Sequence, residues 1–291
     1  MANKDLAQDI TNKVISLLER GNLPAFKKLW SSGGEGYNYS TSKPYQGLNS
    51  LLTAIHCQEH GYSKNAWLTF NQANKLGGRL IKGCGARSLQ LTSYRFVQKT
   101  GEGGKDESYP CLTSFTVYNV AEVEGIAFDF GDADGTANGI TNADATILNE
   151  AASRIGVVVH FGHDSASYSR TFDRIKMPNP SDFISKEAFF AVFAHELVHS
   201  TGHNSRLART FGAAFGDADY AKEELVAELG AAMLCAKYGV DSNIEGHASY
   251  LEGWLSALKS DKRFIFKASS CASKAVALLT GDSTHEINND A

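Results

Sequence analysis

Residues 195–199 read HELVH, and this motif is the strongest indication of how the second half of the chain folds. Histidines four positions apart lie on one face of a helix, so His195 and His199 can bind a single metal ion. Glu196 points beside that ion, where a carboxylate can take a proton from water that the metal activates. We therefore predict an active-site helix over residues 187–199 that carries two metal ligands and a general base.

The third ligand is expected on the next long helix, which the hydrophobic periodicity predicts over residues 220–238. A longer, histidine-rich form of the motif would need a histidine where this chain has Ser205. Glu224 and Glu228 lie one turn apart and resemble the acidic pair of the Glu-type zincins. That resemblance implies that Glu224 binds the metal and that Glu228 accepts the N–H of a ligand histidine. Glu223 is the competing ligand, although no acidic residue follows it four positions on.

Two more residues near the motif are candidates for catalysis. Tyr220 can offer a phenolic donor to an oxyanion, and His203, just after Gly202, can face a substrate or cap the helix end. A His/His/Glu set suits zinc, and mixed nitrogen and oxygen sites also accept manganese or cobalt. The spacing of His160 and His163 in a strand-like stretch turns them to opposite faces, so we do not expect them to bind a metal.

The composition is typical of globular domains, with 43% hydrophobic and 21% charged residues in a chain of 291. The five cysteines are scattered, odd in number and without a CxxC pair, which favours free thiols in a reducing cytoplasm. The N-terminal stretch lacks a signal-peptide pattern, and no run of about 18 apolar residues occurs. We therefore expect a cytoplasmic protein without a membrane span.

Charge is distributed unevenly along the chain. Residues 1–100 hold 13 Lys and Arg against 5 Asp and Glu, whereas the remainder holds 15 against 27. A basic first third suggests an anionic partner, and random variation of surface charge is the alternative. Aromatic rings alternate with the cations in this third, as a single-stranded DNA binder needs, because bases stack on rings while cations follow the backbone. The DNA-binding candidates are Lys64, Trp67, Arg79, Lys82, Arg87 and Arg95.

The pattern predicts an α+β fold in two domains, residues 1–125 and 144–291, joined by a linker over 126–143 of mostly small and polar residues. In the first domain we expect helices over 4–20, 48–61 and 69–76, and strands near 79–82, 89–98 and 112–120. In the second we expect short strands between 156 and 178, and helices over 144–154, 187–199, 220–238, 247–260 and 266–279. An edge strand around residues 168–177 would align a peptide by β-addition.

Several longer stretches resemble one known family. FAHELVHSTGHNSRL (193–207), YAKEELVAELGAAML (220–234), HASYLEGWLSAL (247–258) and DKRFIFKASSCASKA (261–275) are similar to the C-terminal metallopeptidase domain of the ArdC-type antirestriction proteins of conjugative plasmids. YQGLNSLLTA (45–54), GYSKNAWLTFNQANKLGG (61–78) and the Lys82-Gly83 pair resemble the N-terminal domain of that family, which is associated with single-stranded DNA binding.

The sequence departs from the family pattern at two places in this N-terminal half. PAFKKLW (24–30) stands where the family usually reads Pro-Trp…Pro-Trp, and CGARS (84–88) replaces a charged turn rich in Glu and Lys. The resemblance therefore supports the metal ligands more directly than the DNA-binding residues.

The resemblance implies a small α+β nucleic-acid-binding module followed by a zincin-like metallopeptidase domain. The implied function is antirestriction, which combines binding of single-stranded DNA of any sequence with cleavage of a peptide or protein as plasmid DNA enters a new cell. In the alternative, the protein protects DNA by binding alone and the metal only holds the C-terminal fold. A general cytoplasmic protease would leave the basic half without a role.

Overall fold

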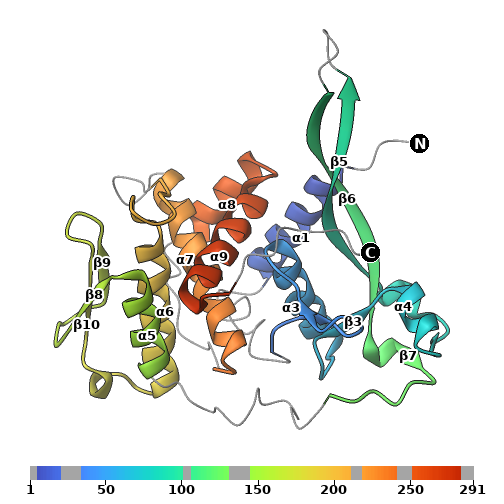
Figure 1. The fold of residues 1–291 in the computed structure, drawn as a ribbon, viewed down its shortest axis with the longest axis horizontal. Coiled ribbons are helices and arrows are strands. Elements are labelled where there is room, and N and C mark those ends of the chain that lie inside the picture. Colours follow the sequence, from blue (N-terminus) through green and yellow to red (C-terminus); the bar gives the residue numbers. More distant parts are fainter. Residues whose placement is uncertain are drawn as a thin grey trace.

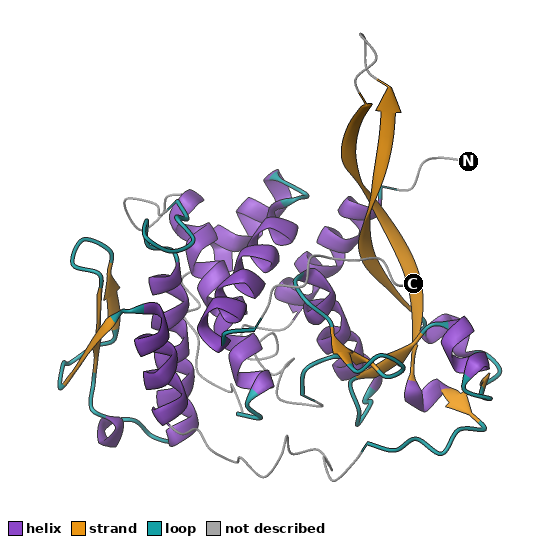
Figure 2. Cartoon of the chain, in the orientation of Figure 1, coloured by secondary structure: helices purple, strands orange, loops and turns teal. Residues whose placement is uncertain are grey.

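The computed structural model of this chain describes residues 5–20, 34–100, 106–130, 145–210, 218–240 and 251–282. A helical body lies between a small sheet on one side and a long β-hairpin on the other (Figure 1). Helices and sheets occur in both halves, and Figure 2 shows that the helices dominate the second half. The α+β prediction is confirmed.

The first half contains helices α1 (Leu6–Arg20), α3 (Leu48–His60) and α4 (Phe70–Lys75). Its strands are β1 (Tyr37–Asn38), β2 (Lys43–Pro44), β3 (Ala66–Leu68), β4 (Arg79–Leu80), β5 (Leu89–Thr100), β6 (Asp106–Asn119) and β7 (Val123–Glu124). Five strands form a sheet in the order β2-β1-β3-β6-β5, and β4 pairs with β7. The β5–β6 ladder runs from Leu89↔Val117 to Thr100↔Asp106, so this hairpin is longer than predicted and projects from the body (Figure 1).

Local signals explain where α4 begins. Thr69 caps the helix, because its hydroxyl accepts the Gln72 amide at 3.3 Å while the Gln72 side chain accepts the Thr69 amide at 2.9 Å. This reciprocal capping box satisfies two backbone donors that would otherwise lack partners. The predicted helix over 69–76 is therefore present, one residue shorter at each end.

The second half contains helices α5 (Ala145–Ile155), α6 (Lys186–Thr201), α7 (Ala218–Lys237), α8 (Leu251–Ser260) and α9 (Phe264–Thr280). Its strands are β8 (Val158–Phe161), β9 (Ser167–Ser169) and β10 (Arg174–Met177), which form a sheet in the order β8-β10-β9. The expected edge strand over 168–177 thus divides into β9, which lies at an edge, and β10, which lies in the centre. Only β9 of this pair offers a sheet edge to a peptide.

One apolar core runs through both halves of the chain. Val14 and Leu51 from α1 and α3 belong to the same buried cluster as Phe193 and Ile265 from α6 and α9. The contact includes polar groups, since the Thr11 hydroxyl donates to the Lys262 carbonyl at 2.8 Å. Figure 1 shows α1 and α3 beside the C-terminal helices.

The predicted division at 126–143 stays a prediction, and most of that stretch lies outside the described residues. The shared core matters for a first domain that ends at residue 125, because such a fragment would expose the apolar side of α1. Within the described ranges, no helix is long and apolar enough to cross a membrane.

Helices α6 and α7 approach closely at a glycine. A Cβ atom added at Gly230 would lie 2.8 Å and 2.9 Å from the two methyl carbons of Val198, which is too close for a real contact. The absent side chain lets α7 bring its acidic residues to the histidines of α6.

We expect Gly230→Ala to destabilise the fold by about 1–3 kcal/mol, because the new methyl group forces the two helices apart, although alanine favours a helix by about 1 kcal/mol. Thermal unfolding measures this change, and Val198→Ala in the same chain should restore part of it. Gly253→Ala is the matched control, since a Cβ there meets Ala221 at an ordinary 3.4 Å. Equal melting temperatures for the parent and Gly230→Ala would contradict the close approach.

Candidate metal centre

The two histidines of the HELVH motif lie one turn apart on α6. The helix begins at a cap in which the Ser185 hydroxyl accepts the Ala188 amide at 3.0 Å, and it ends before Gly202. This turn brings the Nε2 atoms of His195 and His199 within 3.0 Å of each other. The two imidazoles therefore face a common point.

Glu224 reaches the same point from α7. Its carboxylate oxygens lie 3.6 Å from His195 Nε2 and 3.5 Å from His199 Nε2. Two ligand atoms of a tetrahedral zinc ion are about 3.3 Å apart when each bond is about 2.0–2.1 Å. The three side chains, whose ligand atoms all lie within 4.8 Å of one another, thus fit one divalent ion with small adjustments.

The charges around this point favour metal binding. Burial raises the pKa of Glu224, but its hydrogen bonds with His195 and Tyr220 and the charges of both histidines hold the pKa below the ordinary value. Burial lowers the pKa of His195, but the hydrogen bond with Glu224 and the charges of Glu228 and Glu196 raise it to about 9. The cluster of carboxylates attracts positive charge to this point, and a divalent cation supplies it.

Glu223 lies behind His199 rather than at the shared point. Its Oε1 atom is 3.2 Å from His199 Nδ1, on the opposite edge of the ring from Nε2. Glu223 therefore accepts the Nδ1–H and leaves the Nε2 lone pair of His199 available to a metal. Glu228 lies 3.7 Å from Nδ1 of His195, beyond hydrogen-bond distance. The arrangement favours Glu224 over Glu223 as the third ligand and places Glu223 as an acceptor behind His199, and the role expected of Glu228 stays a prediction.

Arg209 completes this arrangement, and sequence reasoning missed it. Its guanidinium donates to both oxygens of Glu223, at 2.9 Å and 2.6 Å, and also to the Thr201 hydroxyl and the Val198 carbonyl, each at 2.7 Å. Arg209 and Glu223 are both buried, at 9% and 4% exposure. The signal that could have found Arg209 is the place of Glu223 next to the ligand candidate Glu224 on the helix that faces the motif, because a carboxylate that is buried there needs a cation.

The remaining catalytic candidates occupy different surroundings. Glu196 is buried, at 8% exposure, one position after His195 on α6. Tyr220 lies one turn before Glu224 and hydrogen-bonds to it. His203 follows the helix end, with its Nδ1 atom 2.7 Å from the Ser205 hydroxyl. This bond holds the ring in the turn that follows α6, and both roles considered for His203 stay predictions.

The comparisons with known proteins agree with both halves of the chain. Residues 4–118 match the N-terminal domain of the anti-restriction factor ArdC, and residues 146–271 match a zincin-like metallopeptidase family. The metal-free crystal structure of the antirestriction protein ArdC from plasmid R388 is similar with a TM-score of 0.79 and 34% identity, over 96% of this chain and 97% of that one. This chain belongs to the ArdC family of antirestriction proteins.

Other relatives of this ArdC-type chain differ in length and in what is known of them. The Mn(II)-bound structure of R388 ArdC is similar with a TM-score of 0.77 and 33% identity, over 97% of this chain and 99% of that one. The uncharacterized protein y4eC of Sinorhizobium fredii is 31% identical over 92% of this chain and 89% of its own. The DNA primase TraC of Escherichia coli is 28% identical over 93% of this chain, which spans only 26% of TraC.

Trp67 and Arg87, two DNA-binding candidates of this ArdC-type chain, are engaged inside the fold. Trp67 is fully buried and donates its indole N–H to Asn65 at 2.7 Å, so it presents no face to a base. Arg87 donates to both oxygens of the buried Glu122, at 2.6 Å and 2.5 Å, so its charge is compensated. The structure removes Trp67 from the stacking candidates and gives Arg87 a structural partner.

The other four candidates lie nearer the surface. Arg79 is exposed and pairs with Glu124 at 2.8 Å, and the Lys64 ammonium lies 5.2 Å from the centre of the Phe130 ring. Lys82 and Arg95 are exposed. Lys82 follows β4 and Arg95 lies on the projecting strand β5, so these two cations are the best placed to contact a phosphate backbone.

We expect Arg209→Ala to destabilise the ArdC-type chain by about 3–5 kcal/mol, because it leaves the Glu223 carboxylate buried and unpaired. Adding Glu223→Gln should recover part of the loss, since the second change removes the uncompensated charge. Urea unfolding of the two single variants and the double variant measures this coupling. Strictly additive losses would contradict a direct ion pair.

Proposed function

We propose that this ArdC-type protein is a divalent-metal-dependent peptidase that also binds single-stranded DNA, and that both activities serve antirestriction. The observation that carries the peptidase proposal is the convergence of His195, His199 and Glu224 on one point. Only three protein groups converge there within the described residues. Structural zinc sites usually have four protein ligands, whereas catalytic sites have three and keep a position open.

In this proposal His195, His199 and Glu224 hold the ion, which we expect to be zinc, with manganese or cobalt as substitutes. A bound ion of this kind polarises a substrate carbonyl and makes water more acidic. Glu196 takes the proton of the attacking water and delivers it to the leaving amine. Tyr220 donates its hydroxyl to the developing oxyanion, and His203 stays a weaker candidate for contact with the substrate.

The DNA-binding proposal rests on the N-terminal half. That half matches the N-terminal domain of the anti-restriction factor ArdC. It carries an excess of cations over acids, and exposed Lys82 and Arg95 belong to that excess. Exposed aromatic rings accompany them, since Phe96 is 65% and Tyr109 45% exposed on the projecting hairpin. Rings and cations together suit single strands of any sequence.

We expect Glu196→Gln to give a folded, metal-loaded protein that binds DNA but neither cleaves a peptide nor protects incoming DNA. The change removes the proton acceptor and keeps the three ligands. Elemental analysis, a peptidase assay and a restriction-protection assay measure the three properties. Undiminished protection by Glu196→Gln would favour the alternative, in which the protein protects DNA by binding alone.

His199→Ala and Glu224→Ala are the matched metal controls for this experiment. Both should lose the ion at the HELVH site, because each removes one of its three ligands. Glu223→Ala should keep the ion more weakly, by about 10–100-fold, since it removes the acceptor behind His199. A full complement of metal in Glu224→Ala would show that the third ligand lies elsewhere.

We expect Lys82→Ala to weaken the binding of single strands of every sequence alike and to flatten the dependence of affinity on salt, because a phosphate contact releases a counterion. Fluorescence anisotropy over a range of salt concentrations measures both effects. Lys186→Ala, at the start of α6, is an exposed control that should leave the salt slope unchanged. An unchanged slope in Lys82→Ala would remove Lys82 from the DNA interface.

A further inference from the structure

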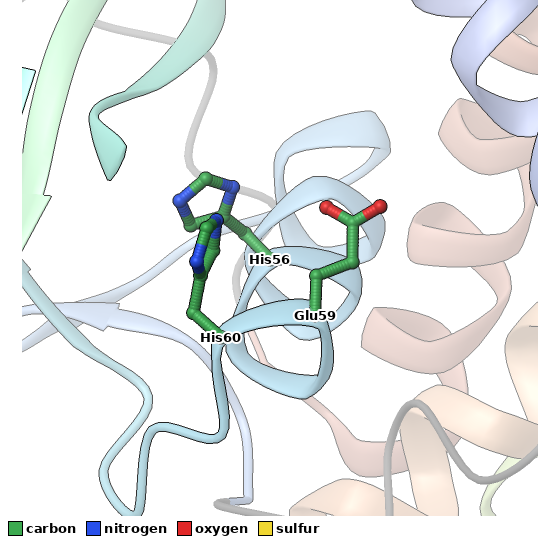
Figure 3. A group of neighbouring side chains, drawn as sticks. All are labelled: His56, Glu59 and His60. Carbon is green, nitrogen blue, oxygen red and sulfur yellow. The ribbon is translucent and has the colours of Figure 1, made fainter. Parts of the chain in front are cut away.

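A second group of metal-ligating side chains lies far from the HELVH motif in the chain, near the end of α3. Residues 56–60 read HCQEH, so His56, Glu59 and His60 stand at positions i, i+3 and i+4 of one helix. Residues with this spacing are neighbours on a helix surface. Their ligand atoms all lie within 4.8 Å of one another. Figure 3 shows the three side chains leaving the same turns of α3, with the two imidazole rings close together.

His56 is already arranged as a ligand. It is buried, at 4% exposure, and its Nε2 atom lies 2.9 Å from the Arg87 carbonyl. A carbonyl oxygen only accepts, so Nε2 carries the proton and Nδ1 keeps its lone pair. The Nδ1 atom is buried and has no hydrogen-bond partner. Such an unsatisfied acceptor is costly, and a backbone carbonyl behind the opposite nitrogen is a common arrangement for metal-binding histidines.

The other two side chains can move to meet this lone pair. The His60 ring lies tilted beside the His56 ring, with centroids 4.3 Å apart, and both His60 and Glu59 are exposed. Tetrahedral zinc needs ligand atoms about 3.3 Å apart. The distances between the ligand atoms of these side chains must therefore shorten by about 1.5 Å at most. Side-chain rotation supplies such a shift while His56 stays in place. The last turn of a helix also favours a cation, because its carbonyls carry partial negative charge.

One competing charge lies beside the cluster. The Lys13 ammonium of α1 lies 3.3 Å from Glu59 Oε2, with both side chains about one-third exposed. A partly exposed pair of this kind stabilises only weakly, so a metal ion can displace it. Lys13 therefore weakens metal binding without preventing it.

We propose that His56, Glu59 and His60 form a second binding site for a divalent cation such as zinc, independent of the HELVH site. Two imidazoles and one carboxylate are ligands that zinc accepts. The ion would satisfy the buried His56 nitrogen and tie together the last turns of α3.

The test is equilibrium dialysis of the full chain against zinc alone, in a His199→Ala background that disables the HELVH site. This background should bind one zinc ion per chain, and adding His60→Ala should abolish that binding. His60 is exposed, so its removal leaves the core intact. Absence of zinc in His199→Ala, or retention of one ion after His60→Ala, would overturn the second site. Equal zinc content in the parent and His199→Ala would count against the HELVH site instead.

Two further variants in the same background sharpen the result. His160→Ala removes an exposed imidazole elsewhere and should retain one zinc ion. Lys13→Gln should bind zinc about two- to fivefold more tightly, because it frees the Glu59 carboxylate. Zinc lost in His160→Ala would show that His56, Glu59 and His60 do not form the site.

Discussion

The close approach of α6 and α7 is the constraint on which the candidate metal centre depends. Gly230 faces Val198 without a side chain, and the two helices can therefore lie almost in contact. About two turns before Gly230, Glu223 and Glu224 of α7 face the histidines of α6. The distances from Glu224 to the two histidines depend on this separation, because carboxylate side chains are short and a metal tolerates little error in ligand position.

The buried ion pair of Arg209 and Glu223 fixes the orientation of the His199 ring. A buried ion pair is a weak source of stability, because each charge must first lose its water. The pair acts here on the orientation of a side chain. Glu223 accepts a hydrogen bond from Nδ1 of His199, so Nε2 is the nitrogen that faces the point shared with His195 and Glu224. Arg209 also binds the Val198 carbonyl near the end of α6, so the same side chain secures the helix and its histidine.

Much of the scaffold could be predicted from patterns, whereas the partners of charged groups could not. Helices α6 and α7 follow from periodicity, and the HELVH spacing places both histidines on one helix face. The role of Arg209 could not be predicted, because the residue lies in no periodic segment and its partner Glu223 is 14 residues away in the chain. Trp67 was misjudged for a related reason. A sequence shows that a ring and a cation are neighbours in the chain, but burial decides whether the ring faces solvent or the core.

The helix α1 has a consequence for the order in which the protein forms. The Thr11 hydroxyl of this helix donates to the backbone carbonyl of Lys262, which lies 251 residues further along the chain. A ribosome releases α1 long before its packing partner α8, so part of the apolar side of α1 stays uncovered until that helix has been made. Contacts of such long range slow folding and leave hydrophobic surface exposed meanwhile. During synthesis, the apolar side of α1 is therefore a surface that a chaperone can cover.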